Sequence, residues 1–228
     1  MKIAIMSAMV EELTPLLEKI GNYTSEEFAN NRYYFSKYRN FEITLAYSKI
    51  GKVNAALTAS TLIQKYGSQK LLFSGVAGAL NSELEIGDLI AATALCQHDL
   101  DITAFGHPQG YVPESKIYAD TDKNMLEIAQ NVAKNADIKL KTGIIATGDQ
   151  FICDSDKKEW IKATFKADAV EMEGASVAFV CDSLNIPFFI LRAISDGAGA
   201  GADFDFDTFL KTSSKVSANF IISMLDKM

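Results

Sequence analysis

The sequence has few of the residues that build disulfide frameworks and metal centres. Its 228 residues include three cysteines and two histidines. Cys96, Cys153 and Cys181 are far apart and odd in number, which argues against a disulfide framework and predicts reduced, mostly buried thiols. The cysteines do not have zinc spacing, and His98 and His107 add no further cluster, so we expect neither a metal nor another cofactor.

Long apolar runs and positive charge are also scarce. No run reaches the ~18 apolar residues that a membrane helix needs, and the short apolar start leads directly into Glu11 and Glu12, unlike a signal peptide. There are 22 basic and 29 acidic residues, a net charge of −7, and no basic stripe. Nucleic acid is therefore an unfavourable partner. These features predict a cytoplasmic protein that binds neither a membrane nor a nucleic acid.

The sequence does have the composition and pattern of an α/β domain. Apolar residues make up 48% and charged residues 22%, which are globular values. No linker or repeat divides the chain, so we expect residues 1–228 to form one domain. Apolar runs alternate with amphipathic ones, which favours a central mixed twisted sheet flanked by helices. The expected strands are 2–6, 33–38, 41–47, 70–74, 87–95, 140–146, 169–172 and 187–194, and the expected helices are 10–20, 53–66, 124–136, 174–184 and 207–228.

Ligands in such folds bind at the carboxyl ends of the strands. The stretches that follow the apolar runs are small and turn-like, and most of them carry acidic groups. They are residues 7–12, 74–78, 147–151, 171–174 and 195–197. We expect several of these stretches to meet at one rim of the sheet.

Three carboxylates in these stretches are candidates for chemistry. Glu12, Glu173 and Asp196 each lie just after an apolar strand. Each one alone is compatible with an N-cap or first-turn acid of a helix. Three at one rim favour acid/base hydrolysis of a glycosidic bond. Neither histidine adjoins a nucleophile elbow, and the glycines of 197–201 lack dinucleotide-binding spacing.

Bulky residues in polar, loop-like settings leave two interpretations open. Phe151, Phe206 and the stretch around Phe105, Tyr111 and Pro113 either fill local cores or contact a ligand. In the second case a planar ligand stacks on Phe151 and the others surround an apolar appendage.

Short motifs run in a fixed order along nearly the whole chain. They are residues 8–12 (AMVEE), 48–55 (SKIGKVNA), 74–78 (SGVAG), 98–99 with 103–106 (HD and TAFG), 147–151 (TGDQF), 170–173 (VEME) and 191–196 (LRAISD). In this order they resemble the bacterial 5′-methylthioadenosine/S-adenosylhomocysteine nucleosidases of the purine nucleoside phosphorylase superfamily. The resemblance implies a homodimer that hydrolyses the N-glycosidic bond of these two nucleosides and releases adenine and the ribosyl product. This reaction serves methionine salvage and the recycling of S-adenosylmethionine by-products.

The resemblance also implies catalytic roles. Asp196 protonates adenine N7 and is steadied by Ser195. Glu12 activates the attacking water, and Arg192 helps to hold it. Glu173 hydrogen-bonds the ribose hydroxyls.

Binding roles follow from the same resemblance. Phe151 stacks on adenine and the Ile152 backbone binds the adenine edge, while Met9, Ile50 and Phe206 line the pocket for the 5′-alkylthio group. The other implied binding positions are Val76, Ala77, Gly78, Glu171 and Met172, with Phe105 and Pro113 reaching in from the neighbouring subunit.

The chemistry of the bond agrees with these roles. Cleavage builds positive charge on ribose and negative charge on adenine. Protonation of N7 removes the second charge, so Asp196 must stay protonated near neutrality and needs a raised pKa. An anionic Glu12 favours the first charge and deprotonates water. The same anion would repel inorganic phosphate, which argues for hydrolysis over phosphorolysis.

The sequence departs from the family pattern at two places. Many members have serine where this chain has Val76, so one polar contact near the water is lost. The stretch after Asp196 is the alternating Gly-Ala segment 197–202, where family members have charged or amide residues. Because glycine is costly to order, we expect a mobile lid ahead of Phe206.

Alternative substrates and functions remain open at this point. Some family members also cleave 6-amino-6-deoxyfutalosine in menaquinone synthesis, and 5′-deoxyadenosine is a further candidate. A purine nucleoside phosphorylase would need phosphate-binding arginine or serine in the first turns, where this chain has Met9 to Glu12. A silent adenosine-binding module would not need both Glu12 and Asp196.

Overall fold

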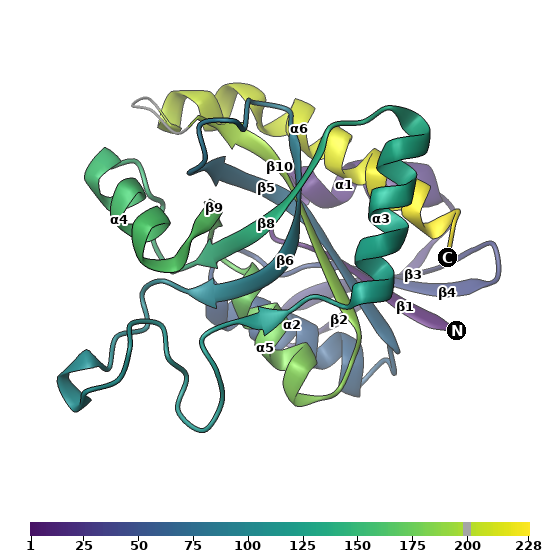
Figure 1. Ribbon diagram of the computed structural model, residues 1–228. Helices are drawn as coiled ribbons and strands as arrows, with labels where there is room; N and C mark the ends of the chain where they lie inside the picture. The colour runs from purple at the N-terminus through teal and green to yellow at the C-terminus, as the bar shows by residue number, and fades with distance from the viewer. Residues whose placement is uncertain (198–201) are drawn as a thin grey trace.

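Alternating strands and helices form one mixed sheet covered on both faces, as shown by a computed structural model (Figure 1). The structure describes the backbone of residues 1–197 and 202–228 and the side chains of residues 1–197 and 208–228. The strands are β1 (Lys2–Ser7), β2 (Thr24–Phe28), β3 (Asn31–Tyr38), β4 (Phe41–Tyr47), β5 (Lys70–Ala79), β6 (Leu89–Gln97), β7 (Ala119–Asp120), β8 (Leu140–Thr147), β9 (Ala167–Glu171) and β10 (Phe188–Asp196). The helices are α1 (Val10–Ile20), α2 (Lys52–Gln64), α3 (Lys123–Ala136), α4 (Ser155–Phe165), α5 (Gly174–Ser183), α6 (Ala202–Leu225) and the short 3-10 helix η1 (Thr103–Phe105).

The strands run in the order β10-β6-β8-β9-β5-β1-β4-β3-β2. Strand β10 also pairs with β5 in parallel, so β5, β10, β6, β8 and β9 close into a ring. Parallel pairs such as β1–β4, β1–β5 and β6–β8 occur with antiparallel pairs such as β3–β4 and β6–β10. The predicted mixed sheet is therefore confirmed, and the closure of the ring brings strands from distant parts of the sequence to one centre.

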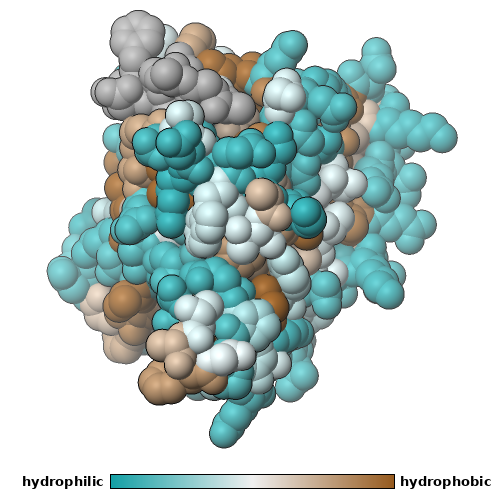
Figure 2. Space-filling model, turned by 60° about the vertical axis from the view of Figure 1, so that its left-hand side comes forward, coloured by the Kyte–Doolittle hydropathy of each residue, from teal (hydrophilic) through white to brown (hydrophobic). Residues whose placement is uncertain are grey.

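Helices cover the sheet in two groups. Figure 1 shows α1, α3 and α6 together on one face and α2 with α5 on the other, and the packing of α1 and α3 on α6 and of α2 on α5 agrees. Strand β10 is buried along its whole length between these layers, as its nearly continuous apolar sequence predicts. None of the helices in the described residues is long and apolar enough to cross a membrane. On the face shown in Figure 2, hydrophobic residues lie in separate patches among hydrophilic ones.

The predicted helices and strands are present. Most of their ends differ by a few residues, but β5 runs on to Ala79 from the expected 70–74, and α6 begins at Ala202 where 207 was expected. Helix α3 illustrates why such elements are predictable: the Asp122 side chain caps it by accepting from the Met125 N–H, and Met125, Ala129 and Val132 line its buried face. Strand β2 and helix α4 were not predicted. Strand β2 is exposed along its length, so no alternation marks it. Helix α4 does carry a signal, the N-cap Asp154 that accepts from a backbone N–H in its first turn.

The sequence prediction was wrong about two of the turn-like stretches. Residues 74–78 are not a turn after a strand but the second half of β5, and Ser195 and Asp196 are the last residues of β10. The reason is close packing above the backbone of β5. A Cβ on Gly75 would lie 2.7 Å from Glu12 Oε1, and one on Gly78 would lie 2.5 Å from Asp196 Oδ2. Glycine at these positions therefore makes room for side chains while the strand continues.

Candidate active site

A pocket of about 410 Å³ lies where the ends of β1, β5, β8, β9 and β10 meet. Its volume falls in the range of small-molecule sites. Each of the stretches expected at one rim contributes to it. The lining residues are Ala8, Met9, Glu12, Ile50, Val76, Ala77, Gly78, Gln150, Phe151, Ile152, Val170, Glu171, Met172, Glu173, Ser195 and Asp196.

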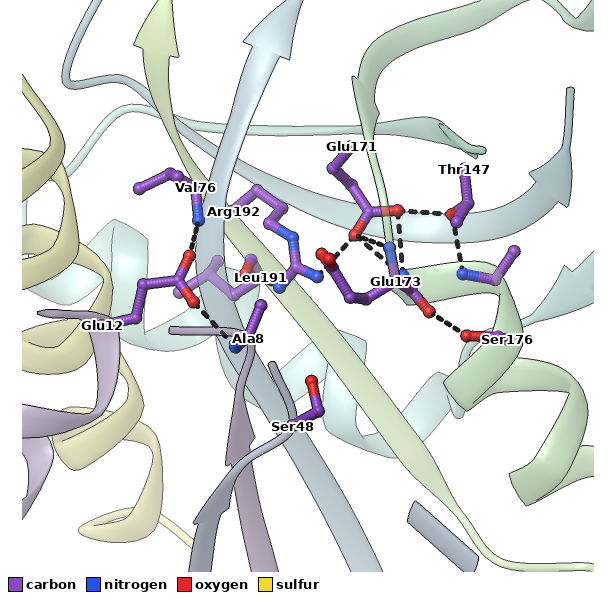
Figure 3. Close-up of polar contacts among 12 residues, drawn as sticks. Ala8, Glu12, Ser48, Val76, Thr147, Glu171, Glu173, Ser176, Leu191 and Arg192 are labelled. Carbon is purple, nitrogen blue, oxygen red and sulfur yellow. Dashed lines mark hydrogen bonds and ion pairs between the residues drawn. The ribbon is translucent and has the colours of Figure 1, made fainter. Parts of the chain in front are cut away.

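Glu12 is held at the pocket wall by three backbone N–H groups. It is the third residue of α1, and its Oε2 accepts from the N–H groups of Ala8 at 2.8 Å and Met9 at 2.9 Å. Its Oε1 accepts from the N–H of Val76 at 2.9 Å (Figure 3). Glu12 is 3% exposed, and burial raises its pKa while Arg192 and the backbone donors oppose that rise. Glu12 is therefore a helix-capping acid and a fixed, buried carboxylate facing the pocket.

Arg192 lies behind Glu12, between it and Glu171 (Figure 3). Its Nη2 pairs with Glu171 Oε2 at 2.6 Å, and the guanidinium stacks 4.0 Å from the centre of the Phe73 ring. Arg192 is 1% exposed and does not line the pocket. Its charge acts on Glu12 by Coulomb attraction. The structure thus places Arg192 as support for the carboxylates, at the back of the site.

Glu171 lines the pocket, but protein groups engage both of its oxygens. It accepts from the Thr147 hydroxyl, from the N–H groups of Glu173 and Gly174, and from Arg192. Thr147 in turn accepts from the Ala175 N–H. This network fixes the turn that leads from β9 into α5, and with it the backbone of Glu173. Glu171 was predicted to bind substrate, and the contacts indicate a role in holding that turn.

Glu173 is the N-cap residue of α5, but its side chain turns away from the helix. Its Oε1 accepts from the Gly51 N–H at 2.8 Å. Burial and the nearby Glu171 carboxylate raise the pKa of Glu173 to about 8, against the opposing charge of Arg192. A carboxyl group of this kind is well suited to a ligand that offers hydroxyl groups.

The loop that carries Gly51 is tied down by a small charged cluster. Lys52 Nζ pairs with Asp99 Oδ1 at 2.7 Å, and its backbone N–H donates to Asp149 Oδ1 at 2.8 Å. The Asp149 N–H closes the cluster by donating to Asp99 Oδ2 at 2.9 Å. The cluster joins the loops after β6 and β8 to the start of α2, and so sets the position of Ile50 and Gly51 beside Glu173.

Asp196 ends β10 and is 3% exposed. The Ser195 hydroxyl donates to its Oδ1 at 2.9 Å, as the resemblance implied. Lys158 Nζ, on the unpredicted helix α4, lies 3.8 Å from its Oδ2 and donates to the Gly197 carbonyl at 2.7 Å. Lys158 is the contact that sequence reasoning missed, because α4 itself was missed.

The remaining predicted binding residues fall into three groups. Met9, Ile50, Val76, Ala77, Gly78, Phe151, Ile152 and Met172 all line the pocket. Phe105 and Pro113 do not line it in this chain; they are exposed in the connection after β6 that projects from the body (Figure 1). The side chain of Phe206 and residues 198–201 of the expected lid lie outside the described residues.

Comparison with known proteins identifies the family. The model of the phosphorylase superfamily matches residues 2–226. The chain belongs to that superfamily. An aminodeoxyfutalosine nucleosidase of Campylobacter jejuni is 62% identical to it over the full length of both chains. A 5′-methylthioadenosine/S-adenosylhomocysteine nucleosidase of a Geobacillus strain is 37% identical, covering 100% of this chain and 99% of that protein.

A solved structure supports the same assignment within the superfamily. The Helicobacter pylori 5′-methylthioadenosine/S-adenosylhomocysteine nucleosidase, complexed with an amino-pyrrolopyrimidine linked to a pyrrolidinol that bears an alkynylthiomethyl group, is 48% identical. It superposes with a TM-score of 0.98 over 100% of this chain and 98% of that one. The predicted membership of the nucleosidase branch of the superfamily is confirmed by these relatives.

Proposed function

We propose that this chain hydrolyses the N-glycosidic bond of 5′-substituted adenosines, releasing adenine. The observation that carries the proposal is that one pocket brings Glu12, Glu173, Asp196 and Phe151 together. Glu12 and Asp196 have different surroundings that suit different roles. Backbone N–H groups hold Glu12, the proposed base, whereas a hydroxyl group and an ammonium group lie beside Asp196, the proposed acid. General acid and base assistance typically contribute ~10²–10⁴-fold each.

In the proposed hydrolysis, the C1′–N9 bond breaks as Asp196 gives its proton to adenine N7. The oxygen of a water molecule bonds to C1′, and Glu12 takes the proton that this water loses. Glu173 accepts hydrogen bonds from the ribose hydroxyls, and Phe151 stacks on the base. Arg192 contributes through its charge on Glu12, because it sits behind that residue and does not line the pocket.

The relatives bear on the choice of substrate and of reaction. Those compared above are named nucleosidases, which supports water over phosphate as the acceptor. The relative at 62% identity is named for aminodeoxyfutalosine. We therefore propose aminodeoxyfutalosine as a substrate beside methylthioadenosine and adenosylhomocysteine, with Met9 and Ile50 lining the 5′ side. This places the chain in menaquinone synthesis as well as methionine salvage.

A second copy of the chain is part of the proposal. Phe105 is 81% exposed, an unusual setting for a large aromatic residue, and Pro113 is exposed nearby in sequence. We propose that both cover the site of the partner in a homodimer.

The three cysteines are free, which supports a reducing compartment such as the cytoplasm.

The experiment is a substrate panel with adenine release as the readout. It contains methylthioadenosine, adenosylhomocysteine, 5′-deoxyadenosine and aminodeoxyfutalosine, each with and without inorganic phosphate. We expect adenine and a free ribosyl sugar from the substrates without phosphate. An absolute requirement for phosphate, with a sugar 1-phosphate as product, would contradict hydrolysis. Failure to cleave aminodeoxyfutalosine would remove only that substrate.

A further inference from the structure

Lys158 is a buried lysine beside the acid at the end of β10. Its side chain and that of Asp196 are each 4% exposed, and its Nζ lies 3.8 Å from Asp196 Oδ2. The same Nζ donates to the Gly197 carbonyl at 2.7 Å. Lysine is almost never fully buried unless it is paired. Helix α4 therefore places a buried positive charge within 4.0 Å of the Asp196 carboxyl group.

We propose that Lys158 is a positioning residue that strengthens Asp196 as the acid of the reaction by stabilising the carboxylate left after the proton has moved to adenine. The inference rests on the proposed role of Asp196. Lys158 and Ser195 contact different oxygens of the carboxyl group, since Ser195 donates to Oδ1 and Lys158 approaches Oδ2. It touches no reacting atom in this account and acts only through Asp196.

The charged groups of the pocket wall, as far as the structure describes it, are paired with one another or are acidic. The neighbouring pocket wall carries the carboxyl groups of Glu12, Glu171 and Glu173, and the positive charge of Arg192 is paired with Glu171. From β5, the backbone of Gly78 packs against Oδ2. Among the described residues, Lys158 is the cation that the structure places within 4.0 Å of the Asp196 carboxyl group.

This arrangement makes two linked predictions. Without the ammonium group the carboxylate is a poorer product, so the proton transfer is slower at low pH. The same change keeps Asp196 protonated to higher pH, so activity survives further into the alkaline range. A lysine that only held the Gly197 carbonyl would alter the rate at every pH without moving the alkaline limb.

The test is the pH profile of kcat/KM for adenine release from methylthioadenosine. Lys158→Met should lower the plateau of kcat/KM about three- to tenfold and shift the alkaline limb to higher pH by about one pH unit. Lys158→Gln should show the same shift, because glutamine keeps a hydrogen-bond donor but no charge. Lys158→Arg should keep the wild-type limb. Lys162→Met, on the same helix, is the matched control and should match wild type.

The outcomes separate this inference from the proposed function. An alkaline limb that coincides with wild type in both Lys158→Met and Lys158→Gln overturns the role of Lys158, even if the plateau falls. Asp196→Asn is assayed in parallel. If it is inactive while the limb of the lysine variants is unmoved, only the lysine inference fails. If Asp196→Asn retains full activity, the acid assignment fails, and the lysine inference fails with it.

Discussion

The Arg192 guanidinium and the Glu171 carboxylate form a buried ion pair, with Nη2 and Oε2 2.6 Å apart, directly behind Glu12. The pair joins the centre of β10 to the end of β9, and both of these strands pair with β5 in the closed ring. It therefore couples the stability of the ring to the geometry of the site.

Removing one partner of this pair should be costly. Glu171→Gln leaves the Arg192 charge buried without its counter-charge, so we expect a loss of about 3 kcal/mol in the free energy of unfolding. Equilibrium denaturation with urea measures it. Glu127→Gln, at an exposed position of α3, removes the same charge and should change stability by less than about 0.5 kcal/mol. Equal stability of the two variants would show that the pair contributes nothing.

The close packing of Glu12 on the backbone of Gly75 predicts that a single added methyl group lowers activity. In Gly75→Ala the new Cβ would lie 2.7 Å from Glu12 Oε1 and 3.0 Å from Arg192 Nη1, so the carboxylate must move. Displacement of a catalytic group by about 1 Å can cost on the order of 100-fold in rate. We expect a fall in kcat of that size while the chain still folds. Near-normal kcat in a folded Gly75→Ala protein would mean that the position of Glu12 is not critical.

Glu173 should make stability depend on pH in a defined window. Its pKa is about 8 in the folded protein against an ordinary value of 4.5, so between these values the folded state holds a proton that the unfolded state has lost. Its contribution to stability is complete below about pH 4.5, falls as the pH rises towards 8, and levels off above. Glu173→Gln removes this fall. Its Tm relative to wild type should therefore rise from pH 5 to pH 8.

Glu127→Gln again serves as the control for the Glu173 prediction, since its Tm difference from wild type should stay flat across the same range. A flat difference for Glu173→Gln as well would show that Glu173 is ionised in the folded protein at neutral pH. Above about pH 8, where Glu173 is ionised, the variant should also bind nucleosides more weakly, because its amide offers one acceptor oxygen to the ribose hydroxyls where the carboxylate offers two.

Much of the site could be predicted because strand ends and motifs are local in sequence. Apolar runs mark β1, β8, β9 and β10, and the small and acidic residues at their ends meet at one pocket. Strands β1 and β10 run parallel to β5, whereas β8 and β9 run in the opposite direction, and the two groups bring their carboxyl ends together where β5 and β9 pair. The family motifs then assign Glu12, Glu173 and Asp196 separate roles. The strand ends and the motifs can be recognised without knowing which strand neighbours which.

The contacts between distant segments could not be predicted in this way. Closure of the ring through the β5–β10 pairing depends on strand order, which no local pattern contains. Gly75 and Gly78 suggested a turn, because a glycine that makes room for a neighbouring carboxylate looks the same in sequence as one that bends the chain. Lys158 and Asp196 are 38 residues apart in the sequence. Lys158 lies on α4, whose many charged residues make its sequence similar to that of a loop. Its Asp154 cap was the available signal.

The claim that Glu12 is the base for water is tested most directly by the neighbouring pair Glu12→Gln and Glu11→Gln. The two residues are adjacent in α1, but Glu12 is buried at the pocket and Glu11 is exposed. The measurement is single-turnover release of adenine from methylthioadenosine, with binding of the nucleoside measured separately. The account predicts a loss of ~10²–10⁴-fold for Glu12→Gln with binding retained, and a wild-type rate for Glu11→Gln. An unchanged rate in Glu12→Gln would contradict it.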